Sequence, residues 1–283
     1  MRNQRGFTLI ELMIASLIGL IVMGGLMNLF ITTNRSVALS DSLAQTQETG
    51  RFAMEYLTKF IRQAGYTEDY TQQSLPFLFA PHGRAGNAGF TSCTTEPESL
   101  ACSANNPGNI RGDRLSIPFD VSPGEEARSC TGTIVKGSDT TEYYVNVFWV
   151  SAATANNREL RCQTYDKGAN DWHDNAVTII NNVESMEFQV GVALDMNRKH
   201  AGRYVSVDRL IAESLLPNVR SIRIALLTTS LDATDNNKVN TTKKERIYSL
   251  LDAPYLTIND GNLRNIFSNT IPLVNAIETA AEN

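Results

Sequence analysis

The chain has 283 residues, of which 42% are hydrophobic and 19% charged, and its formal net charge is −5. This length allows one large domain or two small ones, and the composition is typical of a folded protein rather than a disordered chain. The net negative charge argues against nucleic acid as a partner, because no basic surplus is present to meet phosphates.

A long apolar run lies near the N-terminus. Residues 7–31 carry one charge, Glu11, and follow a short leader that contains Arg2 and Arg5. A helix of this length rises about 37 Å, which is enough to cross a hydrocarbon core of about 30 Å. The run is too long for the apolar core of a secretory signal, although residues 36–38 resemble a cleavage site. We expect a retained single-pass anchor, with the N-terminus cytoplasmic and the rest of the chain outside.

The carboxylate in this run needs an explanation. A charged side chain in a membrane helix costs about 2.5–3.5 kcal/mol, so Glu11 should have a partner or lie near the hydrated interface. The neighbouring residues favour a partner. The stretch Gly6–Glu11 reads GFTLIE, and after a basic leader it resembles the signal of type IV pilins and type II secretion pseudopilins.

This resemblance implies processing and assembly. A prepilin peptidase of that family would cut between Gly6 and Phe7 and methylate Phe7, which makes residues 1–6 a cytoplasmic leader peptide. The new amine on Phe7 then lies one helical turn from Glu11. The spacing lets the carboxylate neutralise either its own amine or that of a neighbouring subunit, and the resemblance favours the neighbour.

The helical pattern continues beyond the apolar run. Apolar residues recur at helical spacing, and no proline occurs before Pro76. The sequence therefore predicts one helix over residues 7–65, which spans the membrane with residues 7–31 and stops at Gly65.

The second half of this helix should pack on a globular domain through Phe52, Leu57 and Ile61. Three basic residues are expected on its solvent side: Arg51, Lys59 and Arg62. Gly50 and the pair Gly24-Gly25 are weak points, because glycine costs about 1 kcal/mol relative to alanine in a helix. The pair is equally compatible with close packing and with local loosening.

Short β runs follow from residue 66 onward. Seven strands are expected, at residues 114–119, 133–136, 143–150, 159–164, 183–190, 221–228 and 265–271. The run 143–150, YYVNVFWV, should be a central strand because it is dense in aromatic and β-branched residues. Residues 66–112 are expected to form a long loop region.

Four cysteines lie beyond the apolar run: Cys93, Cys102, Cys130 and Cys162. An even number in an exported domain suggests two disulfides, and three pairings are possible. Local loop closure favours Cys93–Cys102 with Cys130–Cys162. We expect no metal site, since no CxxC pair occurs and the three histidines are scattered.

Segments in the rest of the chain resemble a more specific family, the PilW-type minor pilins. It is carried by QETGRFAMEYLTKFIRQAGY (47–66) and by residues 182–195, 203–210, 218–230 and 263–273. It implies an α+β pilin-like fold, with the long helix packed on an antiparallel β-sheet domain in residues 66–283.

The resemblance also implies a minor pilin that primes a type IV pilus at or near its tip, with no cofactor. Its expected partners are the prepilin peptidase, other minor pilins, the major pilin, the inner-membrane assembly platform, a possible tip adhesin and membrane lipid. The precursor would lie in the inner membrane, with residues 66–283 in the periplasm.

Other motifs are weaker. Arg111-Gly112-Asp113 spells an adhesion tripeptide but leads into a strand, and residues 232–237 lack the spacing of an EF-hand. His173-Asp174 has no supporting nucleophile motif, so we do not expect an enzyme. Two alternatives stay open: a minor pseudopilin of a type II secretion system, and a membrane-tethered periplasmic adhesin or enzyme outside any filament.

Overall fold

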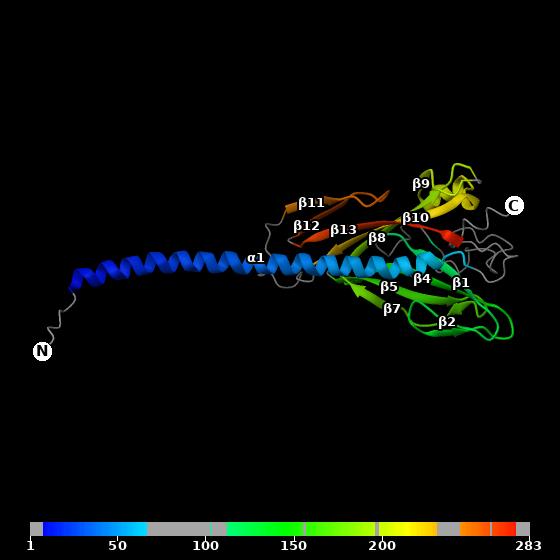
Figure 1. Ribbon diagram of the computed structural model, residues 1–283, viewed down its shortest axis with the longest axis horizontal. Coiled ribbons are helices and arrows are strands. Elements are labelled where there is room, and N and C mark those ends of the chain that lie inside the picture. Colours follow the sequence, from blue (N-terminus) through cyan, green and yellow to red (C-terminus); the bar gives the residue numbers. More distant parts are fainter. Residues whose placement is uncertain are drawn as a thin grey trace.

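The protein combines one long helix with a β-rich domain. The structure, a computed structural model, describes residues 8–66, 103, 112–154, 157–195, 198–230, 244–260 and 262–275. Figure 1 shows the first half of helix α1 projecting away from the domain, while its second half lies along the sheets. This arrangement is the expected α+β architecture.

Helix α1 (Leu9–Gln63) has 55 residues and runs without a break. Thr8 caps its first turn, and the helix ends immediately before a turn that contains Gly65, whose φ is +78°. Glycine adopts this left-handed conformation without a steric penalty, which explains its place after the helix. The prediction of one continuous helix is confirmed.

Two antiparallel sheets form the domain. The first has the order β1 (Leu115–Val121), β4 (Glu142–Thr154), β5 (Asn157–Asp166) and β6 (Asp171–Trp172), and β7 (Val177–Asn181) also pairs with β5. The second has the order β13 (Arg264–Pro272), β10 (Val219–Thr229), β8 (Val183–Val192) and β9 (Arg203–Val205).

Smaller elements lie outside these two sheets. They are the hairpins β2 (Glu126–Arg128) with β3 (Ile134–Lys136) and β11 (Lys244–Tyr248) with β12 (Leu256–Asp260), the helix α2 (Val207–Ala212) and a 3₁₀ turn (Leu216–Asn218). All seven predicted strands are present, most of them longer than expected, and β4 is an inner strand as predicted.

The core forms where the second half of α1 packs on both sheets. Ala53, Leu57 and Ile61 are fully buried, and they pack in one cluster with residues of β1, β4, β8, β10 and β13. These three residues recur at spacings of four along one side of the helix. Burial of this side joins the helix and both sheets into one unit.

The prediction that Phe52 belongs to this buried face is wrong. Phe52 is 47% exposed and its ring stacks on that of Tyr56, with 6.1 Å between centroids. Phe52 precedes Leu57 by five residues, which places the two about 140° apart around the helix. The basic residues Arg51, Lys59 and Arg62 are exposed, as predicted.

Gly50 has a packing role that its sequence context did not reveal. A Cβ atom at this position would lie 2.1 Å from the Phe267 ring of β13. The absence of a side chain at Gly50 therefore lets strand β13 approach the helix. The cost of glycine within the helix is offset by this close contact.

We expect Gly50→Ala to lower the free energy of unfolding of the β domain by about 1–3 kcal/mol, because the new methyl group must displace the Phe267 ring. Thermal unfolding followed by near-ultraviolet circular dichroism measures the change. The matched control is Gly24→Ala, whose Cβ would meet nothing within 4 Å. Equal melting temperatures for Gly50→Ala and wild type would contradict this account.

Candidate assembly interface

The first half of α1 exposes an almost continuous apolar surface. Among the described residues, α1 is the one helix that is long and apolar enough to cross a membrane, and its most apolar 18-residue window has a mean hydropathy of 2.3. None of that window is buried within the protein. Side chains such as Leu9 (78% exposed) and Phe30 (64%) are uncovered. A surface of this size requires lipid or other apolar helices to cover it.

Glu11 takes part in a capping box at the start of this helix. Its Oε2 accepts hydrogen bonds from the Thr8 backbone N–H at 3.0 Å and from Thr8 Oγ1 at 2.9 Å. In return, the Glu11 backbone N–H donates to Thr8 Oγ1 at 3.4 Å. These bonds satisfy donors that every helix N-terminus leaves without an intrahelical partner.

Sequence reasoning missed this role for Thr8, although the signal was present. A threonine followed three residues later by glutamate, just before an apolar run, is the usual pattern of a capping box. The Glu11 side chain is exposed, so the local bonds leave it accessible to a further partner. Gly6 and Phe7, the expected cleavage and methylation site, lie outside the described residues.

A disulfide joins Cys130 to Cys162, one of the two local pairings that the sequence favoured. Cys162 lies in β5, and Cys130 follows β2. The Tyr56 hydroxyl of α1 donates to the Cys130 carbonyl oxygen, so the helix is tied to the disulfide region. Cys93 and Cys102 lie outside the described residues.

The His173-Asp174 pair serves a structural purpose. The Asp174 carboxylate accepts hydrogen bonds from the Thr131 hydroxyl and from the Thr164 backbone N–H. It thereby ties the turn after β2 to β5. His173 is exposed and packs edge-on against Tyr144, with 5.6 Å between ring centroids.

The adhesion tripeptide is not presented at the surface, because Asp113 is fully buried. Its Oδ2 accepts a hydrogen bond from the Phe188 backbone N–H at 2.9 Å. Residues 232–237 lie outside the described residues. Among the residues that are described, no group of three or more His, Cys, Asp or Glu side chains is placed to hold a metal ion.

Asp113 forms a buried carboxyl pair with Glu187, which is 6% exposed. Burial, followed by the nearby Asp113 charge, raises the pKa of Glu187 to about 8. Glu187 is therefore protonated at neutral pH in the folded protein. The sequence did not signal this pair, since the two residues lie far apart in the chain.

Two family models match the chain. The family described as type IV pilus-assembly protein W matches residues 147–275, and the prokaryotic N-terminal methylation motif matches residues 1–27. The chain is a type IV pilin-like protein with a PilW domain. The matched PilW residues include strands β8, β10 and β13, and the methylation motif includes Gly6, Phe7 and Glu11.

A comparison with solved structures gives a distant likeness. A type IV-like pilin from Thermus thermophilus is similar over 84% of this chain and 96% of its own, with 16% identity and a TM-score of 0.37. The comparison with curated proteins found no match. The long helix and antiparallel sheets of this chain give it a pilin-like architecture, and the PilW domain points to a structural protein.

The raised pKa of Glu187 leads to a pH-dependent stability. Between about pH 4.5 and 8 the folded state keeps a proton that the unfolded state has lost, so the free energy of unfolding should fall as pH rises through this window. The slope is up to about 1.4 kcal/mol per pH unit. We expect Glu187→Gln to flatten it, as measured by urea unfolding at several pH values.

The control for this experiment is Glu245→Gln, which replaces an exposed carboxyl group. It should keep the wild-type slope. A Glu187→Gln protein with the same pH dependence as wild type would show that Glu187 does not hold its proton in the folded state.

Proposed function

We propose that this PilW-domain protein is a minor pilin, a low-copy subunit of a type IV pilus that primes assembly at or near the tip. Its precursor would be held in the inner membrane and cut by a prepilin peptidase between Gly6 and Phe7, with methylation of Phe7. The observation that carries the proposal is the uncovered apolar half of α1, which continues without a break into a second half that packs on strands of the PilW domain.

Lipid covers this half before assembly, and the apolar helices of neighbouring subunits cover it afterwards. Both environments are water-poor, so the same surface is stable in both. The continuous helix matters mechanically, because its second half is buried in the domain core at Leu57 and Ile61. Force on the first half therefore reaches the β domain through a rigid element rather than a linker.

Glu11 sets the register of this packing. Its carboxylate is the one charge in residues 7–31, and pairing with the Phe7 amine of a neighbour removes an uncompensated charge from an apolar environment. A subunit shifted along the helix axis would lose this pair. The capping box with Thr8 holds the carboxylate at the helix terminus, where the amine of the neighbour arrives.

The topology follows from charge and redox chemistry. Arg2 and Arg5 precede the span, which favours a cytoplasmic N-terminus. The Cys130–Cys162 disulfide requires an oxidising compartment, which favours a periplasmic β domain. The proposed partners are the prepilin peptidase, the other minor pilins, the major pilin and the inner-membrane assembly platform.

The direct test is the N-terminal mass of the protein in whole membranes and in sheared surface filaments. We expect a chain that begins at methylated Phe7 and is present in trace amount in the filaments. Membranes in which every copy keeps an intact Met1, or a start near Leu39, would overturn the proposal. A deletion strain should lose pili and keep normal secretion, whereas a pseudopilin would give the opposite result.

Glu11→Leu should leave the protein in the membrane but reduce its incorporation into filaments by about tenfold or more, because an uncompensated amine then remains in the apolar core. Immunoblots of sheared filaments and membranes measure the ratio. Leu12→Ile is the matched control, since it changes an adjacent side chain of the apolar run and keeps both the carboxylate and its bonds to Thr8. Normal incorporation of Glu11→Leu would contradict the assembly role.

A further inference from the structure

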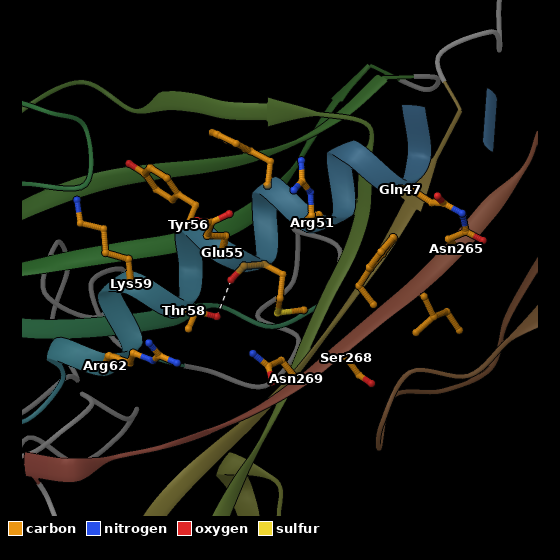
Figure 2. Close-up of a pocket in the computed structure, with 14 residues that line it drawn as sticks. Gln47, Arg51, Glu55, Tyr56, Thr58, Lys59, Arg62, Asn265, Ser268 and Asn269 are labelled. Carbon is orange, nitrogen blue, oxygen red and sulfur yellow. Dashed lines mark hydrogen bonds between the residues drawn. The ribbon is translucent and has the colours of Figure 1, made fainter. Parts of the chain in front are cut away.

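A groove runs between the second half of α1 and strand β13. Figure 2 shows its two walls, with Arg51, Glu55, Lys59 and Arg62 along the helix and Asn265, Ser268 and Asn269 along the strand. Five consecutive residues of β13, 265–269, line it. Successive side chains of a strand point to opposite faces, so a lining of consecutive residues means that the groove follows the edge of the strand rather than one face.

Strand β13 is an edge strand of its sheet, and its only described strand partner is β10. At the two ends of this pairing, the Leu273 N–H donates to the Arg220 carbonyl oxygen, and the Ser230 N–H donates to the Leu263 carbonyl oxygen. The pairs Arg220–Leu273 and Ser230–Leu263 continue the same antiparallel register as the β10–β13 pairs that lie between them. Hydrogen-bonded pairs alternate with non-bonded pairs in an antiparallel ladder. The odd-numbered residues of β13 therefore bond to β10.

The even-numbered residues consequently direct their backbone N–H and C=O groups toward the open edge. They include Ile266, Ser268 and Thr270, and all three side chains are exposed. Such a row is a ready template for a further strand. The outer face of the neighbouring strand β10 is covered by the β11–β12 hairpin, which packs on Ala225 and Leu227. The edge of β13 itself remains uncovered by any described strand.

The charged side chains of the helix wall favour one sign of charge on any strand that binds at this edge. The groove is lined by three basic side chains, Arg51, Lys59 and Arg62, and by one carboxylate, Glu55. Arg51, Lys59 and Arg62 are exposed, and no described carboxylate forms a salt bridge with any of them. A strand that enters the groove would pass along a wall with a net positive charge, which favours carboxylates on that strand.

We propose that this groove binds an extended, acidic segment of a neighbouring pilin-like subunit, which adds to the edge of β13 as an extra strand. The proposal rests on the proposed function, since it supplies the subunit contact outside the membrane. Backbone hydrogen bonds to Ile266, Ser268 and Thr270 would provide the alignment. Arg51 and Arg62 would select for acidic side chains.

The test uses the full chain in cells that produce it with its natural partners. A photocross-linking amino acid, p-benzoylphenylalanine, replaces Ser268 on the edge or, as a control position, Tyr255, which is 77% exposed and outside the groove lining. Cross-linked peptides from membranes are identified by mass spectrometry. We expect Ser268 to capture an Asp- and Glu-rich segment of another pilin-like subunit, and Tyr255 not to capture it.

Two further variants separate edge pairing from simple proximity. Thr270→Pro removes an outward N–H and leaves the bonds to β10 in place, so it should lower the cross-link yield by about tenfold with little change in melting temperature. Thr270→Ser keeps the N–H and the hydroxyl that accepts from Arg223, and it should keep the yield. Arg51→Glu with Arg62→Glu should also lower the yield.

Several results would overturn the proposal: a cross-link within the same chain, to a second copy or to lipid, a yield no higher than at Tyr255, or an unchanged yield in Thr270→Pro. The cross-link is scored in membranes, before filaments form. Its loss in a protein that still enters filaments would refute the groove proposal alone. Exclusion of the wild-type protein from filaments would instead refute the proposed function.

Discussion

The structure depends on burial of one side of the second half of α1 against two sheets. Ala53, Leu57 and Ile61 lose all contact with water, and the sheets acquire a common core through them. At roughly 1.5–3 kcal/mol for a buried leucine or isoleucine side chain, this face contributes enough to hold a helix whose other half has no support from the domain. The direction in which the apolar half projects is thus set by packing at the opposite end of the same helix.

Polar contacts define where the helix leaves the domain. The Asn265 amide donates to the Thr46 hydroxyl, and the Thr228 hydroxyl donates to the Thr46 carbonyl oxygen, so strands β13 and β10 both hold the helix at one level. Beside them, the buried Arg264 guanidinium pairs with Glu184 at 2.7 Å and with Asp260 at 2.6 Å, and so joins β13 to β8 and β12. Because a buried charge without a partner is costly, these pairs specify one position of β13. The position of the groove beside β13 is therefore fixed as well.

Most of the framework could be predicted from local patterns. The apolar run, the glycine at position 65 and the seven strands each depend on residues close in sequence, and so does the loop closed by Cys130 and Cys162. The strands that escaped prediction, such as β7, β11 and β12, are short and only partly buried, so their hydrophobic alternation is weak. Phe52 shows a different limit, because an apolar residue near a buried stripe is not necessarily on it.

The sequence by itself determined the long helix, its apolar first half, the isolated Glu11 and the motif around Gly6, because periodicity and charge placement act over a few residues. Only the tertiary structure decided which partners meet. The bond from the Phe188 N–H to Asp113 spans 75 residues, and Gly50 meets a ring at Phe267. The groove likewise joins a helix near the start of the chain to a strand near its end. Such contacts depend on how the sheets pack around the helix. Burial is stabilised by the sum of many weak contacts, so no single position in the sequence carries a signal of them.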